Sequence, residues 1–229
     1  DRTERILRQM KQFDRAELKK LFRANDKITE ENFQRYQNMD LRKGLTPAVL
    51  SYNGLAFNNM APQVFTDGQW EYAKKNLKIL SGFYGILNAT DGVVPYRLEM
   101  QTRVGIDGAK DLYDFWGDSL YRRIADEVRE DVSEGIEPII LNLASKEYSQ
   151  AVEPFVEANI RFVTCVFAEY SGDKLITKGT KAKMARGQMV AFLANEHAQD
   201  LNVVKQFSGM GFRYSEEHSS EKEMMFIQV

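Results

Sequence analysis

The sequence predicts an α+β fold, in which one compact mixed domain has a small buried sheet flanked by helices. Two nearly continuous apolar runs, residues 139–143 and 160–168, have the length and composition of buried strands. Several longer segments instead repeat apolar residues every three to four positions, as amphipathic helices do. No internal repeat, linker or low-complexity stretch interrupts the 229 residues. We therefore expect a single domain over residues 1–229.

The N-terminal third is expected to be mainly helical. Residues 1–23 fit one or two amphipathic helices. A further helix over about residues 29–39 is predicted to begin at Thr29, because threonine is a good N-cap. We expect a short strand and turn over residues 49–57 and then a helix over residues 69–80, whose apolar residues recur at helical spacing.

The second half is predicted to alternate helices with strands. A helix should cover residues 118–132, before the first apolar run. The run at residues 160–168 is followed by a Ser-Gly-Asp turn signal, so residues 174–177 are expected to return as its hairpin partner. A helix over residues 180–198 and a closing strand over residues 224–229 complete the chain.

The segment of residues 80–118 differs from the rest because it is rich in glycine and aromatic residues and has little regular period. A long irregular segment inside a compact domain is usually functional or disordered, and the aromatic content argues against disorder. Its first part, the glycine corner of residues 81–85, has two glycines three apart. Such a turn can direct several backbone N–H groups at a phosphate. The alternative, which these residues alone favour, is a helix C-cap at a packed corner.

A basic cluster lies between residues 174 and 186, where five cations occur without an acid between them. Lys183 and Arg186 are three apart on the predicted helix and therefore share a face. Positive side chains near a helix start suit a phosphate group, although a solvated lysine face is the alternative. The predicted DNA- or phosphate-binding residues are Lys78, Ser81, Gly82, Tyr84, Gly85, Arg97, Lys181, Lys183 and Arg186.

Other residues could line a pocket. Arg97 and Glu99 would point the same way on a strand and could pair, either as a structural salt bridge or with Arg97 on a phosphate. Asn142 and Ser145 follow a predicted strand at the start of a short helix, a place where ligands often bind, although a simple capped helix is the alternative. The possible pocket comprises Tyr96, Glu99, Trp116, Asn142 and Ser145, with Trp116 either in the core or as a stacking surface.

Composition limits the function classes. The net charge of −2 and the sequence pI near 5.9 oppose DNA binding as a bulk property, so only a local basic face could support it. A single cysteine, Cys165, excludes a disulfide framework and fits a reducing cytoplasm. The two histidines lack zinc-ligand spacing, and no P-loop occurs, so we expect no metal and no cofactor. No apolar run is long enough to span a membrane.

Six motifs occur in order along the chain: LSGFYGIL, PYRLEM, LYDFWGD, LNLASKEY, the basic segment of residues 183–187 and SGMGFRYS. Together they resemble the YaaA family of bacterial peroxide-stress proteins over residues 1–229. The resemblance implies a cytoplasmic protein of unusual mixed fold that carries a helix-hairpin-helix element, protects against hydrogen peroxide and binds duplex DNA. Two departures limit the transfer. The family's opening strand and Ser-Pro-Ala-Lys turn do not occur in this sequence, and Asn53 stands where the family often has lysine.

Two functions are therefore compared. The first is a DNA-binding protein of the peroxide response, which would hold double-stranded DNA by its phosphates with little sequence preference. The second is an enzyme that acts on a nucleotide or another phosphorylated small molecule, for which Arg97, Asn142 and Arg186 would share a deep pocket. The sequence does not determine the oligomeric state, and a monomer is favoured.

Overall fold

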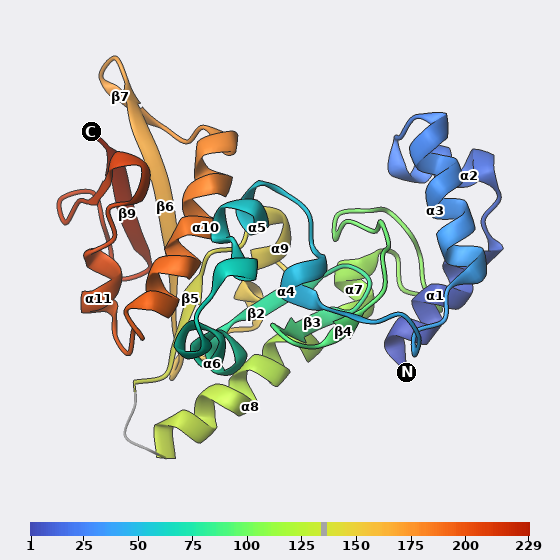
Figure 1. Cartoon of the computed structure of the whole chain (residues 1–229), viewed down its shortest axis with the longest axis horizontal. Helices are drawn as coiled ribbons and strands as arrows, with labels where there is room; N and C mark the ends of the chain where they lie inside the picture. The colour runs from blue at the N-terminus through green and yellow to red at the C-terminus, as the bar shows by residue number, and fades with distance from the viewer. Residues whose placement is uncertain (134–136) are drawn as a thin grey trace. The chain divides into compact units, whose positions relative to one another are not determined.

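The computed structural model describes residues 1–133 and 137–229, with residues 130–133 described by their backbone alone. The α+β class is confirmed, because helices and small sheets are both distributed along the chain (Figure 1). The chain divides into two compact units, which interleave along the sequence. Unit 1 comprises Asp1–Ser51, Lys78–Arg122 and Lys146–Pro154, and unit 2 comprises Tyr52–Leu77, Arg123–Ser145 and Phe155–Val229. One domain over residues 1–229 stays a prediction.

Unit 1 is mainly helical and contains two short antiparallel sheets. One sheet pairs β1 (Thr46–Pro47) with β4 (Gly92–Val93), and the other pairs β2 (Lys78–Ser81) with β3 (Gly85–Asn88). The helices within unit 1 are α1 (Arg2–Gln12), α2 (Arg15–Phe22), α3 (Asp26–Asn38), α4 (Ala48–Ser51), α7 (Leu112–Trp116) and α9 (Lys146–Ser149). The division between the units falls within α8 (Ser119–Ser133), after Arg122.

The core of unit 1 includes buried residues of α1 and α3, and α3 contacts the glycine corner through Tyr36 and Phe83. Ile6 and Met10 of α1 are fully buried one turn apart. Tyr36 of α3 is also fully buried, and its ring contacts the Phe22 and Phe83 rings at centroid distances of 6.5 and 6.0 Å. Its hydroxyl donates to the Arg97 carbonyl at 2.8 Å, and burial raises the pKa of Tyr36 well above its ordinary value. This contact fixes the backbone of residues 95–100 to α3.

Unit 2 is organised around a five-stranded mixed sheet of order β5–β6–β9–β8, with β7 also paired to β6. The central strand β6 (Arg161–Ser171) runs parallel to β5 (Ile139–Asn142) and to β9 (Glu223–Gln228). β7 (Lys174–Ile176) and β8 (Phe212–Tyr214) are antiparallel to their partners. Besides part of α8, the helices of unit 2 include α5 (Leu55–Met60), α6 (Asp67–Asn76), α10 (Gly179–Asn195) and α11 (Leu201–Lys205). Its 3-10 turns include η1 (Pro62–Val64) and η3 (Gly209–Gly211). A further 3-10 turn, η2 (Glu153–Phe155), lies at the boundary between the units.

Helix α10 packs along one face of this sheet. Alternate residues of β6, including Cys165, join the buried stripe of Ala182, Ala185 and Met189 in one core cluster. On its other side, α10 approaches α5 so closely that a Cβ on Gly187 would lie 1.9 Å from the Ala56 carbonyl oxygen. The absence of a side chain at Gly187 therefore allows the backbone of α5 to pack closely against α10.

Most of the predicted strands are confirmed, and three helix or strand predictions are wrong in part. The helix expected from Thr29 begins at Asp26, because Asn25 caps it by accepting the Ile28 N–H at 3.0 Å. The expected strand over residues 49–57 is instead helical, as α4 and α5. The helix expected over residues 69–80 ends at Asn76, because the next residues pair with β3.

Within the described residues, no helix has both the length and the apolar character needed to cross a membrane.

Candidate functional site

The predicted site residues fall into both units. Unit 1 contains Lys78, Ser81, Gly82, Tyr84, Gly85, Tyr96, Arg97, Glu99 and Trp116, and unit 2 contains Asn142, Ser145, Lys181, Lys183 and Arg186. The two sets are described separately.

The glycine corner is the turn between β2 and β3, so the expectation of a helix C-cap is wrong. It is also not the hairpin of a helix-hairpin-helix element, because the elements on either side are strands. Ser81, which is 1% exposed, accepts the N–H groups of Phe83 and Tyr84 at 3.2 and 2.9 Å. Its hydroxyl also lies 2.5 Å from that of Tyr96. The backbone N–H groups expected to face a phosphate are therefore engaged inside the turn.

Both glycines of this corner are required by close packing. A Cβ on Gly82 would lie 2.7 Å from the Leu98 carbonyl oxygen. Gly85 has a φ of +80°, and a Cβ there would lie 2.8 Å from the Trp116 ring. The Trp116 indole N–H donates to the Gly82 carbonyl at 3.1 Å. Trp116 is thus part of the core of unit 1, and its ring is not exposed for stacking on a base.

Arg97 and Glu99 form the pair that their spacing predicts, but they do not lie on a strand. Arg97 and Glu99 form an ion pair of 3.0 Å in an irregular segment, and both side chains are exposed. Lys78 of β2 donates to Asn88 across the hairpin at 2.7 Å. An exposed pair such as that of Arg97 and Glu99 contributes little to stability. Its charges cancel locally, so Arg97 adds little positive potential.

The basic cluster of unit 2 is arranged around a carboxylate that the sequence patterns did not single out. Glu169 of β6 pairs with Lys178 and with Lys181, each at 2.5 Å, and Lys181 also donates to Gln228 at 2.6 Å. Hydrogen bonds from Lys178 and then Lys181 lower the pKa of Glu169 below its ordinary value. The alternation of side chains along β6 could have indicated that Glu169 faces the basic helix. Glu169 lies on the same face of the strand as Cys165, and α10 covers that face.

The remaining cations of the cluster have no acidic partner among the described residues. Lys174 and Lys183 are exposed, and the side chain of neither forms an ion pair or hydrogen bond there. Arg186 is different, because its Nε is buried and has no acceptor among the described residues. Burial lowers the pKa of Arg186, although guanidinium remains charged at neutral pH.

Asn142 does not share a pocket with Arg186. Its amide donates to the Thr164 hydroxyl at 3.1 Å, and its carbonyl oxygen accepts the Ala144 N–H at 2.9 Å. Because Thr164 and Cys165 are neighbours on β6, their side chains point to opposite faces of the sheet. Asn142 therefore lies on the face away from α10. Ser145 follows the same strand and is half-buried.

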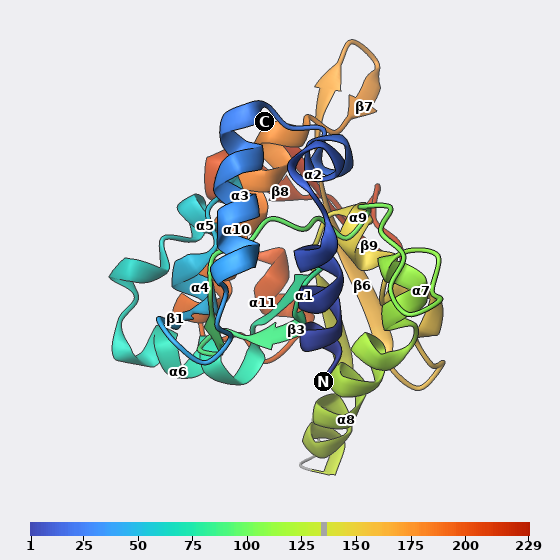
Figure 2. The same cartoon turned by 90° about the vertical axis from the view of Figure 1, so that its right-hand side faces the viewer.

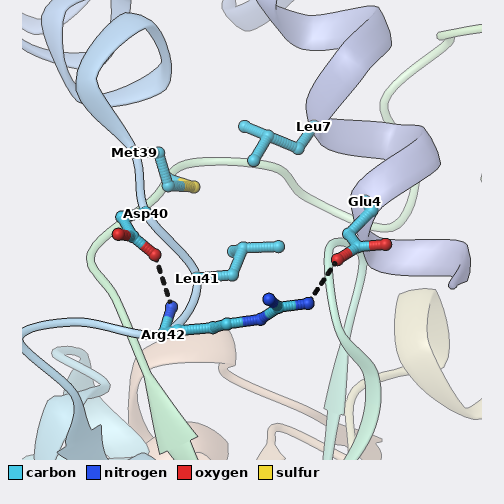
Figure 3. Close-up of a pocket in the computed structure, with 6 residues that line it drawn as sticks. All are labelled: Glu4, Leu7, Met39, Asp40, Leu41 and Arg42. Atoms are coloured by element: carbon cyan, nitrogen blue, oxygen red, sulfur yellow. Dashed lines mark hydrogen bonds and ion pairs between the residues drawn. The ribbon is translucent and has the colours of Figure 1, made fainter.

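Two surface hollows contain none of the predicted residues. A hollow of about 380 Å³ in unit 1 lies between α1 and the segment after α3 (Figure 3). Arg42 crosses its mouth to reach Glu4 at 3.4 Å and donates its backbone N–H to Asp40 at 2.9 Å. A second hollow, of about 220 Å³ in unit 2, is lined in part by Arg161, Lys205 and Tyr214. The charges in the first hollow are already paired, so it offers no excess positive charge to a phosphate.

These features define an α+β protein in which unit 2 carries a cluster of basic side chains, two of them paired with Glu169. Residues 1–218 match the family described as "Peroxide stress protein YaaA". The chain belongs to this family.

Curated relatives agree with this assignment. A UPF0246 protein of Agathobacter rectalis is 47% identical over 99% of this chain and 87% of its own length. UPF0246 proteins of Lachnoclostridium phytofermentans and Desulfitobacterium hafniense are 44% and 43% identical over the whole of this chain, and over 86% and 88% of their own lengths. The resemblance inferred from the six motifs is thereby confirmed.

Proposed function

We propose that this protein binds duplex DNA through phosphate contacts, with little sequence preference, as part of the response to hydrogen peroxide. The observation that carries the proposal is the basic cluster of unit 2, in which cations outnumber carboxylates over a short stretch. A cytoplasmic location is part of the proposal, because a reducing compartment suits a protein whose one cysteine is buried.

The local charge opposes the charge of the whole chain. From Glu169 to Gly187 the sequence has five cations and two carboxylates, a local net charge of +3, whereas the chain as a whole has −2. Charges farther apart than about 8–10 Å are largely screened at physiological salt. A phosphate near this stretch would therefore experience the local excess rather than the overall acidity.

The β6–β7 hairpin gives this positive surface an extended shape. In both views the hairpin projects beyond α10 (Figures 1 and 2). Lys174 lies on its returning strand, and Tyr170, which is 53% exposed, lies directly across from Leu175. Lysines on a protruding two-stranded ribbon can follow a DNA backbone, and an exposed ring can lie against a sugar or base.

The test is a binding titration on two unrelated duplexes at about 50 and about 200 mM salt. The triple variant Lys174→Ala, Lys178→Ala, Lys183→Ala should weaken binding to both duplexes alike. It should also reduce the slope of log affinity against log salt by about 0.9 for each phosphate that the variant no longer neutralises.

A matched control removes three exposed lysines of unit 1, through Lys20→Ala, Lys27→Ala and Lys43→Ala. This control should leave the affinity close to that of the wild type. Affinity that does not respond to salt, or a larger loss in the control than in the basic-cluster variant, would contradict the proposal. Binding of a mononucleotide in preference to duplex DNA would instead favour an enzyme that acts on small phosphorylated molecules.

A further inference from the structure

Arg186 is the one described residue with a buried side-chain nitrogen or oxygen that lacks a hydrogen-bond partner. Its charge is not compensated among the described residues, because it makes no ion pair there and no aromatic ring lies beneath it. Buried polar groups are almost always paired, so an unpaired one requires a specific explanation. The cost is larger for a charged group than for a neutral one.

The position of Arg186 on α10 explains its burial. It lies four residues after Ala182 and three before Met189, both of which are buried against β6. Arg186 therefore belongs to the helix stripe that turns toward the sheet, where an apolar residue would be expected. A methionine or leucine would fill this position without the cost of removing a charge from water.

The neighbouring thiol cannot act as a counter-ion. Cys165 is the ionisable group that interacts electrostatically with Arg186. Burial raises the pKa of Cys165 to about 12, so its thiol is neutral at physiological pH. The guanidinium consequently has no negative partner among the described residues of unit 2.

The terminal nitrogens of Arg186 are not fully buried, and the residue as a whole is half-buried. These nitrogens also have no acceptor among the described residues. A guanidinium presents its nitrogens as a planar fork that matches the oxygens of phosphate. Lys183, three residues earlier and exposed, lies on the same side of α10 and has no acidic partner in the described chain.

The helix that holds this pair is fixed in place. Gly187, next to Arg186, is in backbone contact with α5, and this contact leaves no room for even a Cβ. Arg186 is thus presented from a rigid element, which reduces the entropy lost when a ligand binds.

We propose that Arg186, assisted by Lys183, is the receptor for a single tetrahedral oxyanion, namely a phosphate group. The phosphate could be free, could belong to a mononucleotide or could be one phosphate of a DNA strand, and all three share the same recognition chemistry. The proposal does not depend on duplex binding by the basic cluster, because a site for one small anion would exist without it.

The test is thermal unfolding with inorganic phosphate, a nucleoside monophosphate or a short duplex, against sodium chloride at equal ionic strength. Phosphate should raise the Tm of the wild-type protein in a saturable manner, and Arg186→Met should abolish this rise. In buffer without phosphate, Arg186→Met should raise the Tm by about 2–4 °C, because an uncompensated charge is removed. Arg186→Lys should keep only part of the phosphate effect, because lysine lacks the fork.

The matched control is Arg213→Met, which removes an exposed arginine of β8 in the same unit. It should keep the full phosphate effect, since a general salt effect acts on all variants alike. The proposal is overturned if Arg186→Met lowers the Tm or fails to fold, or if it keeps the phosphate effect. It is also overturned if none of the three probes stabilises the wild-type protein. A shift with the duplex alone would assign the site to DNA, whereas a shift with free phosphate would assign it to a small anion even if duplex binding fails.

Discussion

The carboxylate of Glu169 holds the ammonium of Lys181 at 2.5 Å and shares its other oxygen with Lys178 at the same distance. The side chain of Glu169 is 14% exposed, so the acid lies largely beneath the lysines that it binds. One acid thereby sets the spacing of two cations at the start of α10 while leaving the surface of the cluster positive.

Replacing Glu169 by glutamine should strengthen DNA binding, provided that the basic cluster is the binding surface. The substitution removes a negative charge beside two lysines and keeps a polar side chain of the same shape. We expect roughly a threefold gain in affinity at moderate salt, with a smaller gain as salt increases. A fluorescence-anisotropy titration of both proteins checks this, and equal affinities would place the DNA away from Glu169.

The same carboxylate makes stability depend on pH in one direction. Its two lysines lower the pKa of Glu169 in the folded protein, so the folded state favours the ionised carboxylate. The stabilisation is fully present above the ordinary carboxyl pKa and is lost as the pH falls through the lowered folded pKa. The Tm difference between the wild type and Glu169→Gln should therefore shrink as the pH falls below the ordinary carboxyl pKa of 4.5. A difference that grows on acidification would contradict this pairing.

Gly187→Ala should be strongly destabilising, because the new methyl group would lie 1.9 Å from the Ala56 carbonyl oxygen. We expect a loss of about 3 kcal/mol in the free energy of unfolding, measured by chemical denaturation. Gly179→Ala is a matched control on the same helix, because a Cβ there would meet no atom within 4 Å. It should change the free energy by less than about 1 kcal/mol.

Ser81→Ala should separate structure from binding at the glycine corner. The hydroxyl of Ser81 accepts two backbone N–H groups and contacts the Tyr96 hydroxyl, and alanine would remove these hydrogen bonds from a buried turn. We expect a loss of about 1–3 kcal/mol in stability. DNA affinity measured well below the Tm should not change. A loss of DNA affinity without a loss of stability would instead support the glycine corner as a phosphate-binding site.

Cys165 should be inert toward thiol reagents in the folded protein. It is 1% exposed, and its pKa is raised to about 12. Only the thiolate reacts readily, so labelling should proceed at the rate at which unit 2 opens. Mass spectrometry after a timed pulse of iodoacetamide, with and without denaturant, measures this. Rapid labelling of the native protein would contradict this and would make Cys165 a candidate peroxide sensor.

Local sequence patterns were sufficient to predict secondary structure where apolar residues dominate a segment. The apolar runs that became β5 and β6 both lie in the sheet, so composition alone predicts the two strands. Their burial differs, because β6 alternates buried and half-buried residues along its centre, whereas β5 is half-buried except at Asn142. The predicted helix over residues 69–80 was wrong at its end for a long-range reason. Leu77 and Leu80 keep a helical spacing, but Leu80 pairs with Ile86 in a hairpin. Pairing of this kind outweighs local propensity.

The candidate site was less predictable because its contacts join distant residues. Lys178 and Lys181 follow one another closely, but their shared partner Glu169 is reached only through the turn at Gly172. The spacing of the glycines also did not reveal which group accepts the backbone N–H groups of the glycine corner. The Ser81 hydroxyl accepts two of these N–H groups, which the sequence pattern had assigned to a phosphate. The interleaved segments of the two units have no boundary signal in the sequence.

β6 runs without interruption from the centre of the sheet to the turn at Gly172, and its last residues pair with β7. The ribbon that carries Lys174 is therefore anchored as a continuation of a core strand rather than joined to the core through a hinge. A spin label placed at Asp173, next to that turn, should tumble with the whole of unit 2. The distances between Lys174 and the other lysines of the basic cluster would then be set before a ligand binds.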